Sequence, residues 1–351
     1  MNIKKMIAAT MILGMLGMAT ASATGILPTD ALKLPEWDVI SSSYGGKLLL
    51  SDSPEMVYGD GIMYRDSVVG NARLFFHHVN ATQTDKRIVA ILENEEDRPA
   101  EVIVHRYGLG GPNKDWIQVG KDAEVAYMDG GPLYIINIPP RGKALLSQKL
   151  GESVVKPDML VNGIYDFMTN RMVRVSTMMM PVDVKPEAFA GQAKVLAADE
   201  YRLRGTFDGC ERLLIGAKLY DGDTDGAVAV TLADNNIDKY VSGIDATDGS
   251  KVCNYGNYGI VYHIFLPTTE GKPLSYSINP RGGTYAGAIG LKYRHANLPS
   301  VQTPDDKLFM GTATEAEYSE IGKFPGGDSL WLTFSPPGAS NLPVKLIISP
   351  E

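Results

Sequence analysis

Three aspartates alternate with small residues in the segment Asp221-Gly222-Asp223-Thr224-Asp225-Gly226. Carboxylates at alternate positions followed by glycine form the first half of a calcium-binding loop, because hard oxygen ligands at this spacing can surround one ion. Leu232 stands where such a loop carries its bidentate glutamate, so another residue, such as Asp234, would have to complete the site. The segment predicts either a calcium site at Asp221, Asp223 and Asp225 or a solvated acidic turn between two strands.

Two aromatic or basic side chains in loops are candidates for binding a ligand. Trp116 lies in a segment rich in Gly, Pro and Asn, where an exposed indole can stack on a sugar ring. Arg281 lies in the segment Asn279–Gly283, where its guanidinium can hold a carboxylate or sulfate, or instead cap the end of a sandwich through backbone carbonyls. Trp331, within the apolar run Leu330–Phe334, is expected in the core.

The histidines are not spaced as a metal site. His77 and His78 are adjacent on an expected strand, so their side chains point to opposite faces and cannot chelate one ion together. His105 can join one of them only if the two strands pair. The alternative is that these histidines cap or pack within a sandwich.

Short catalytic motifs are absent. The sequence contains no Walker A, HExxH or GxSxG motif, and Gly108–Asn113 lacks the spacing of a dinucleotide-binding loop. We expect a loop there, because Gly110-Gly111-Pro112 is a poor start for a helix. A carboxylate pair that hydrolyses a glycoside has no short motif. The sequence therefore favours a protein that is not an enzyme and leaves an acidic hydrolase open.

The first residues have the order of a secretory signal peptide. Lys4 and Lys5 precede an apolar run from Met6 to Met18, and Ala21-Ser22-Ala23 places small residues at the cleavage positions. The run is shorter than the ~20 residues that a membrane-spanning helix needs. We expect a cleaved signal over residues 1–23, with an uncleaved anchor as the alternative. The mature chain would then be periplasmic, bound to the cell wall or extracellular, with no transmembrane segment.

Charge and cysteine content narrow the partners. The net charge is −8, and removal of Lys4 and Lys5 makes it −10, which disfavours nucleic acid and anionic lipid. Cys210 and Cys253 are the only cysteines and can form a disulfide in an oxidising compartment. The alternative is two thiols on strands that never meet. Without a CxxC motif, neither redox catalysis nor structural zinc is supported.

Short apolar or alternating runs separated by Gly, Pro, Asn and Asp predict an all-β fold. Because amphipathic helices do not intervene, antiparallel sandwiches of the immunoglobulin-like or jelly-roll-like type are favoured over a parallel sheet. Short helices are expected at Glu187–Ala198 and Thr314–Ile321. Strands are expected at Arg73–Val79, Arg87–Leu92, Glu101–Tyr107, Leu133–Ile138, Val173–Met178, Leu213–Tyr220, Ala227–Leu232, Tyr258–Leu266, Leu274–Ile278, Ser329–Phe334 and Val344–Ile348.

A boundary between two sandwiches is expected near Pro181–Ala190, where one series of strands ends and another begins. The expected organisation of the mature chain is a lead-in arm over 24–44, an N-terminal sandwich over 45–182, a linker over 183–194 and a C-terminal sandwich over 195–351.

Several segments resemble one protein family. These are Arg73–Asn80, Ile91–Asn94, Asn257–Ile264, Asn279–Gly287 and Pro336–Val344. They are similar to secreted, uncharacterised Firmicutes-type proteins that often carry an appended copper amine oxidase N-terminal-like, or stalk, domain. The resemblance implies secretion but supplies no catalytic residue. The stalk domain itself is not recognisable here, and neither copper nor amine oxidation is implied.

Taken together, these features favour an exported, non-enzymatic protein that binds a cell-wall or extracellular polysaccharide or an envelope protein. The alternatives are a glycan-directed hydrolase with an acidic pair, and a self-assembling surface subunit with residues 24–44 as a donated strand. A hydrolase predicts a deep cleft with two carboxyls of raised pKa. A binding protein predicts a shallow groove or exposed aromatics, and an assembly subunit predicts an unpaired edge strand and a detached arm.

Overall fold

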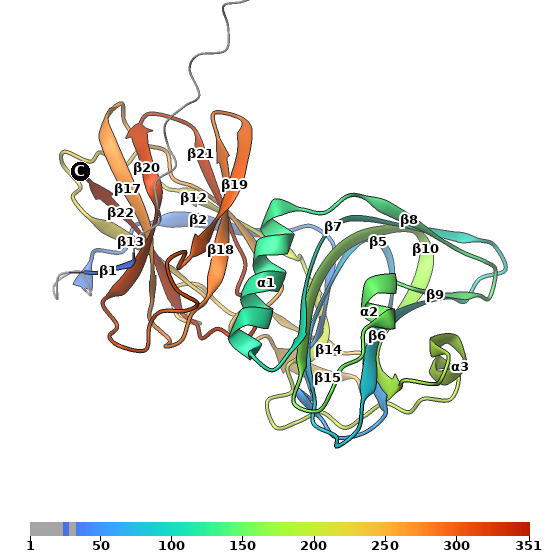
Figure 1. The fold of residues 1–351 in the computed structure, drawn as a ribbon. Helices are drawn as coiled ribbons and strands as arrows, with labels where there is room; N and C mark the ends of the chain where they lie inside the picture. Colours follow the sequence, from blue (N-terminus) through green and yellow to red (C-terminus); the bar gives the residue numbers. More distant parts are fainter. Residues whose placement is uncertain (1–23, 28–32) are drawn as a thin grey trace, which may run out of the picture.

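The computed structural model describes residues 24–27 and 33–351. The expected signal peptide, residues 1–23, lies outside the described residues, as do residues 28–32 of the expected arm. The described chain is built mainly of β-strands in three sheets (Figure 1). The prediction of an all-β sandwich fold is confirmed.

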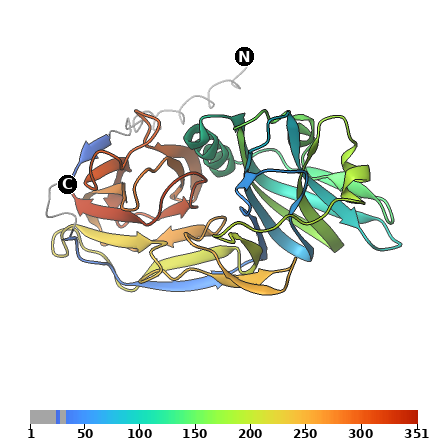
Figure 2. The same ribbon diagram turned by 90° about the horizontal axis from the view of Figure 1, so that it is seen from below.

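Two of the sheets form a C-terminal sandwich, with its core between them (Figures 1 and 2). The five-stranded sheet has the order β1 (Thr24–Ile26), β20 (Glu317–Gly326), β17 (Gly271–Pro280), β22 (Val344–Pro350), β13 (Val228–Leu232). The six-stranded sheet has the order β19 (Ala296–Thr303), β18 (Gly287–Tyr293), β21 (Leu330–Phe334), β16 (Val261–Phe265), β12 (Glu211–Gly216), β2 (Val39–Tyr44).

The third sheet has eleven strands. Its main order is β15 (Ser250–Cys253), β14 (Ser242–Asp245), β11 (Arg204–Asp208), β3 (Lys47–Ser51), β5 (Gly61–Asn80), β10 (Leu160–Pro181), β6 (Lys86–Asn94), β9 (Lys143–Leu145). In addition, β4 (Met56–Val57) pairs with β5, and β7 (Ala100–Asn113) pairs with β10 and β8 (Tyr134–Ile138). The pairs β3–β5 and β4–β5 in the eleven-stranded sheet and β12–β16 in the six-stranded sheet are parallel, so these two sheets are mixed and not purely antiparallel as expected. The five-stranded sheet is antiparallel throughout.

The long strands β5 and β10 curve strongly (Figure 1). The first half of β10 pairs with β7 and the second half with β6, and its register against β5 shifts between Thr169 and Val173. Such irregularities bend a strand. The sheet therefore curls around a core of its own, which includes Leu74, Phe76 and Phe167.

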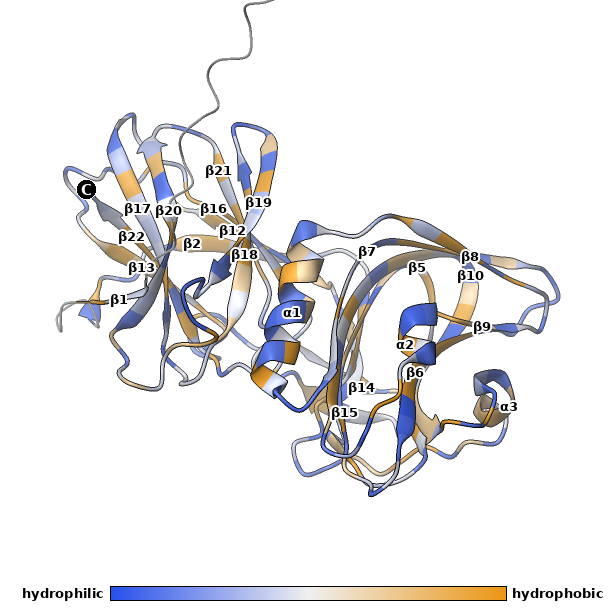
Figure 3. Ribbon diagram, in the orientation of Figure 1, coloured by the Kyte–Doolittle hydropathy of each residue, from blue (hydrophilic) through white to orange (hydrophobic). Residues whose placement is uncertain are grey.

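Three helices occur in the described part of the chain, namely α1 (Trp116–Asp129), α2 (Gln148–Glu152) and α3 (Pro186–Ala190). None of them is long and apolar enough to cross a membrane. Helix α1, the longest, carries both hydrophilic and hydrophobic residues (Figure 3). Helix α1 lies between the eleven-stranded sheet and the C-terminal sandwich (Figure 1). Asp115 caps it by accepting the Gln118 N–H at 3.1 Å. A Cβ on Gly120 would lie 1.8 Å from the Gly338 carbonyl oxygen, so only glycine permits this approach.

Three local predictions are wrong. The expected loop Gly108–Asn113 is the end of β7, where the sheet satisfies its backbone. The expected helix Thr314–Ile321 is largely β20, because pairing with β17 outweighs local helix preference. The expected helix Glu187–Ala198 is reduced to the single turn of α3.

An antiparallel pair of segments passes from the C-terminal sandwich into the eleven-stranded sheet. β2 pairs with β12 in the six-stranded sheet, and β3, which follows β2, pairs with β11 in the eleven-stranded sheet. The two segments change sheet at Gly45 and Gly209, with φ of 88° and 76°, values that favour glycine. The Cys210 N–H donates to the Gly46 carbonyl at 3.0 Å and joins the segments there. We call segments 39–51 and 204–216 the crossing ribbon.

The sheets divide the chain differently from the expected ranges. The described residues of the expected arm, 24–44, supply β1 and β2 to the C-terminal sandwich. Conversely, β11, β14 and β15 lie in the expected C-terminal range but belong to the eleven-stranded sheet. The crossing at Gly45 nevertheless coincides with the expected start of the N-terminal sandwich.

Arg73, on β5, is buried beside the point where the crossing ribbon changes sheet. Its Nε and Nη2 donate to the two carboxylate oxygens of Asp166, at 2.5 and 2.9 Å. Its Nη1 donates to the carbonyls of Cys210 and Gly259, at 2.6 and 3.2 Å. One guanidinium therefore joins two strands of the eleven-stranded sheet to the crossing ribbon and to the start of β16.

Two further groups complete the Arg73 network. Nη2 also donates to the Tyr127 hydroxyl on α1 at 2.9 Å and to the Glu211 carboxylate at 2.5 Å. Tyr127 in turn donates to Asp166 at 2.7 Å. Burial raises the pKa of Asp166, but the charge and hydrogen bonds of Arg73 outweigh it and hold this pKa below its usual value. Asp166 is therefore ionised and paired.

Arg73→Met should lower the free energy of unfolding by about 3–5 kcal/mol, because it leaves a buried carboxylate without its partner. Urea denaturation at neutral pH measures this change. The control is Arg294→Met, since the Arg294 guanidinium is 65% exposed and pairs with Asp328. The control should cost about 0–1 kcal/mol. Similar small losses in both variants would contradict the role given to Arg73.

Candidate functional site

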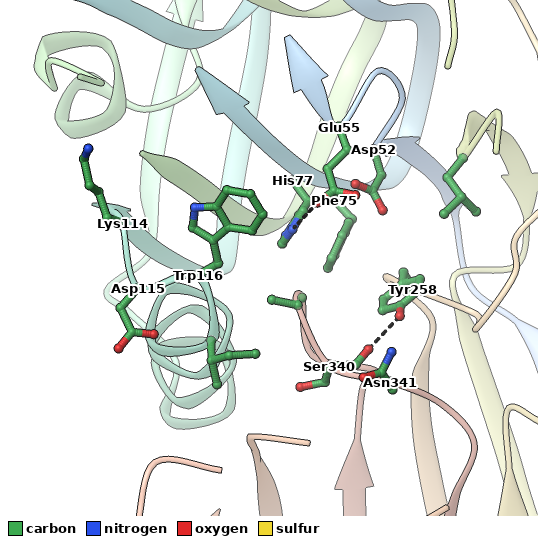
Figure 4. Close-up of a pocket in the computed structure, with 14 residues that line it drawn as sticks. Asp52, Glu55, Phe75, His77, Lys114, Asp115, Trp116, Tyr258, Ser340 and Asn341 are labelled. Carbon is green, nitrogen blue, oxygen red and sulfur yellow. Dashed lines mark hydrogen bonds and ion pairs between the residues drawn. The ribbon is translucent and has the colours of Figure 1, made fainter. Parts of the chain in front are cut away.

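A pocket of about 800 Å³ lies at the junction of the eleven-stranded sheet, α1 and the C-terminal sandwich (Figure 4). This volume falls within the roughly 300–1,000 Å³ that small-molecule sites occupy. We call it the junction pocket. The lining residues used below are Asp52, Glu55, Phe75, His77, Lys114, Asp115, Trp116, Tyr258, Gly338, Ser340 and Asn341.

Strand alternation explains why β5 supplies the pocket. Arg73, Phe75 and His77 are spaced by two and therefore share one face of β5, the face toward the C-terminal sandwich. Leu74 and Phe76 point the other way, into the core of the eleven-stranded sheet. The strand that carries the buried Arg73 anchor thus also places two side chains in the junction pocket.

Asp52 directly follows β3, and its carboxyl points into the pocket (Figure 4). The residue as a whole is half-buried, but its Oδ1 is completely covered and has no hydrogen-bond partner among the described residues. Burial raises the pKa of Asp52 well above its usual value, and the carboxylates of Glu55 and Asp199 raise it further. Burial and Asp199 also raise the pKa of Glu55. Both acids therefore keep their proton to a higher pH than exposed carboxyls do.

Asp199 fixes the loop that carries these acids. Its carboxylate accepts the Ser53 hydroxyl at 2.8 Å and the Glu55 N–H at 2.9 Å. It also accepts the N–H groups of Tyr201 and Arg202, both at 3.1 Å. These bonds fix the conformation of residues 52–55 and keep the Asp199 carboxylate next to this loop.

His77 lines the pocket, and its Nε2 is 4.0 Å from Glu55 Oε1 (Figure 4). It is 5% exposed, and Nδ1 has no hydrogen-bond partner among the residues that the structure describes. Burial, with a smaller effect of His78, lowers the pKa of His77 to about 3, so the ring is neutral. A Cβ on Gly338 would lie 2.7 Å from Nδ1, so only glycine permits the backbone to pack this closely against the ring.

His78 points away from the pocket and has partners on both ring nitrogens. Its Nε2 lies 2.8 Å from the Ser51 hydroxyl and its Nδ1 lies 2.9 Å from the Pro54 carbonyl. The adjacent histidines thus face opposite ways, and His105, exposed on β7, joins neither of them. Within the described chain, no group of three or more His, Cys, Asp or Glu is arranged to hold a metal ion.

Aromatic side chains form other parts of the pocket wall. Trp116 is in the first turn of α1, not in a loop as expected, and its Nε1 donates to the Asp158 carbonyl at 3.0 Å. The Tyr258 hydroxyl donates to the Ser340 carbonyl at 2.7 Å, and its ring centroid is 6.2 Å from that of Phe75. The fold therefore brings Trp116, a residue singled out from the sequence, to the rim of a pocket.

A second hollow, of about 950 Å³, surrounds the exposed side of the Arg73 network. Its wall includes Asp166, Glu211, His263 and Trp331. The carboxylates here are paired, because Asp166 binds Arg73, and Glu211 binds Arg73 and lies 2.7 Å from His263 Nε2. The junction pocket, with unpaired buried polar atoms, is the better candidate for a ligand site.

The other residues singled out from the sequence lie outside both hollows. In the acidic segment, Asp225 accepts the Asp221 N–H at 2.9 Å and Lys218 at 3.2 Å, while Asp223 lies 3.7 Å from Lys272. Calcium at Asp221, Asp223 and Asp225 stays a prediction. Arg281 follows β17, where its N–H donates to the Pro343 carbonyl at 3.0 Å.

The expected disulfide is not formed, and Cys210 and Cys253 are free thiols. Cys210 lies in the crossing ribbon after β11, whereas Cys253 ends β15, two strands away in the same sheet. Two strand spacings are roughly 10 Å, more than a disulfide spans between Cα atoms.

No protein-family model matches the chain, and no curated protein matches it. Among solved structures, the CUB1-EGF-CUB2 domain of human MASP-1/3 is 10% identical, with 89% of this chain and 99% of that chain covered and a TM-score of 0.19. The Lactobacillus farciminis oxalate decarboxylase formate complex is 8% identical, with 90% and 88% covered and a TM-score of 0.12. At these values, neither likeness carries an argument about fold or function.

Asp52→Asn should raise the free energy of unfolding at pH 8 by about 1–2 kcal/mol, because the amide cannot ionise and a difference of one pKa unit between the folded and unfolded chains corresponds to about 1.4 kcal/mol. The pKa of Asp52 is higher in the folded chain than in the unfolded chain. The wild type is therefore destabilised as the pH rises from the unfolded pKa through the folded pKa, and the gain should vanish near pH 3–4.

Urea denaturation at pH 4, 6 and 8 measures this dependence. Asp305→Asn is the matched control because Asp305 is exposed. A gain for D52N that stays constant with pH, or that is greatest at pH 4, would show that the Asp52 carboxyl is not held in its neutral form.

Proposed function

We propose that this protein is an exported binding protein of the cell envelope or extracellular space, and that its junction pocket holds a saccharide unit of a surface polysaccharide. One observation carries this proposal. Asp52 Oδ1 and His77 Nδ1 are buried without hydrogen-bond partners among the described residues, and both residues line a pocket that aromatic side chains also line. Sugar hydroxyls need fixed donors and acceptors, while the C–H faces of sugar rings pack on aromatic side chains.

The protonation states of the pocket suit hydroxyl groups. A neutral imidazole offers one donor and one acceptor, and a protonated carboxyl offers a donor as well as acceptor capacity. His77 is neutral at physiological pH because of its burial. Asp52 is biased toward its protonated form for the same reason. Such groups can exchange hydrogen bonds with hydroxyls without the desolvation cost of a full charge.

The described parts of the expected arm, 24–44, are strands of the C-terminal sandwich. β1 pairs with β20, with Thr24 opposite Ser319, and β2 pairs with β12. The described parts of the 24–44 arm are thus strands within their own chain. This arrangement gives no support to the hypothesis of a detached arm donated to another subunit.

A glycan-directed hydrolase is the second candidate, because two carboxyls with raised pKa values, Asp52 and Glu55, line one pocket. A protonated Asp52 is the form that a general acid needs. Glycoside hydrolysis also needs a second, ionised carboxylate. Burial and Asp199 raise the pKa of both acids, so their environments do not separate an acid from a base. The geometry therefore supports binding better than hydrolysis.

Trp116→Ala should weaken binding of the mature protein to its wall polysaccharide about tenfold, or about 1.4 kcal/mol, the size of one stacked aromatic contact. Co-sedimentation with purified cell-wall polysaccharides measures the affinity. Trp331→Ala is the matched control, because this tryptophan lines the second hollow and not the junction pocket. Its indole stacks on Phe265, with 4.9 Å between the ring centroids.

Three results would change the proposal. Wild-type protein that binds no wall polysaccharide, or binding that W331A weakens as much as W116A, would refute a saccharide site at the junction pocket. Release of reducing ends that disappears in D52N would favour the hydrolase. Loss of binding on chelation, restored by calcium, would support calcium at Asp221, Asp223 and Asp225.

A further inference from the structure

The charged groups at the junction pocket are mainly acidic. Asp52 and Glu55 line its interior and Asp199 lies behind them, whereas Asp115 is exposed at the rim, where it caps α1. Lys114 is the one basic residue among the described lining residues. Its side chain is 61% exposed, points outward in Figure 4 and lies 3.4 Å from Asp158, outside the pocket. The interior of the pocket therefore has negative character with no positive charge of its own.

The acid at the centre of this cluster has no counter-charge. Proteins normally pair a buried carboxylate with a cation or with several hydrogen-bond donors. For Asp52 Oδ1 the described residues provide neither, and the nearest charged groups, Glu55 and Asp199, are also acids. A cation that arrives with the ligand would remove this deficit.

His77 is an independent sign of a ligand. It is 5% exposed, and its unpartnered Nδ1 belongs to a ring that lines the same pocket. The neutral His77 ring has one acceptor nitrogen. Asp52, Glu55 and His77 can therefore supply three acceptors, and Figure 4 shows these three side chains in the same part of the pocket. An ammonium group has three N–H donors, which matches this number.

The aromatic wall also favours a cation. Phe75, Trp116 and Tyr258 line the pocket around the acids. The face of an aromatic ring attracts a cation through its quadrupole, and tryptophan does so most strongly. A pocket with acidic groups, aromatic rings and no internal basic residue favours a ligand with a protonated amine over a neutral or anionic ligand.

We propose that the saccharide bound in the junction pocket carries a protonated amine, so that the ligand class is an amino-sugar glycan with free amino groups. This inference rests on the proposed function and adds the charge of the ligand. The ammonium donates to Asp52, Glu55 and His77 Nδ1, while the sugar ring packs against Trp116. Each carboxyl that is protonated before binding releases its proton to solvent as the ammonium takes its place.

Two matched probes test this charge. A β-1,4-linked glucosamine tetramer and its N-acetylated counterpart share one sugar backbone and differ in the positive charges. Isothermal titration calorimetry should show about tenfold or tighter binding of the amine form, a preference that declines with salt. Titration in two buffers of different ionisation enthalpy should show proton release with the amine probe only.

The variant D52N/E55Q should lose the preference for the amine probe while still unfolding cooperatively. The control D305N/E315Q removes two exposed acids elsewhere and should keep the preference. If D52N/E55Q does not fold, the single variant Glu55→Gln and the salt dependence of the wild type replace it. A preference that survives in these pocket variants overturns the inference.

The remaining outcomes separate this inference from the proposed function. Equal affinity for the two tetramers, or tighter binding of the acetylated one, overturns the amine and leaves the saccharide site standing. Tighter binding of spermidine than of the glucosamine tetramer overturns the amino-sugar class. Failure of both tetramers overturns the inference, whereas the proposed function is decided by the Trp116 test on whole polysaccharide.

Discussion

The arrangement of the two sandwiches depends on one buried guanidinium at the point where the crossing ribbon changes sheet. Arg73 binds Asp166 of the eleven-stranded sheet, Tyr127 of α1, and the carbonyls of Cys210 and Gly259 at the entrance to the C-terminal sandwich. A buried charge is tolerated only when it is paired and fully hydrogen-bonded, and here nearly every donor of the group has a partner. The network therefore constrains the arrangement of the fold, because each partner of Arg73 lies on a different element and all of these elements have to meet at the guanidinium.

The junction pocket follows from the same constraint. Phe75 and His77 are on the strand face that carries Arg73, and Gly259, which accepts from Arg73, is adjacent to Tyr258 in the pocket wall. The contacts of Arg73 thus fix how far the pocket wall on β5, formed by Phe75 and His77, lies from the wall formed by Ser340. The two regions differ in how their polar groups are satisfied. Asp166 is paired with Arg73 and ionised, whereas Asp52 Oδ1 is enclosed without a partner among the described residues. An unsatisfied buried acid lowers the stability of the fold, a cost that functional sites often carry.

Local sequence signals were sufficient for the strands but not for the way they combine. Each expected strand overlaps a strand of the structure, because period-two burial and β-branched residues are local properties. The bounds differ, since Leu213–Tyr220 extends past the end of β12 at Gly216. Helix α1 escaped prediction, since Gly120 interrupts it and two of its charged residues, Lys121 and Glu124, are buried against other elements. The crossing ribbon depends on pairing between residues far apart in the chain. Asp52 and His77 carry no motif, and only the fold brings them together, whereas Trp116 was found because its loop-like surroundings suggested exposure.

The junction pocket is formed by separate parts of the fold, so a ligand bound in it can hold these parts together. Its roof belongs to the eleven-stranded sheet, its floor to the loop Gly338–Asn341 of the C-terminal sandwich, and its side to the first turn of α1. A ligand that contacts all three adds contacts across the junction and stabilises the folded arrangement by mass action. Gly120 lets α1 approach Gly338, so the helix that presents Trp116 is held against the floor of the pocket. Binding in the pocket and the packing of the C-terminal sandwich against the eleven-stranded sheet are thus two aspects of one interface, which contains both Arg73 and Asp52.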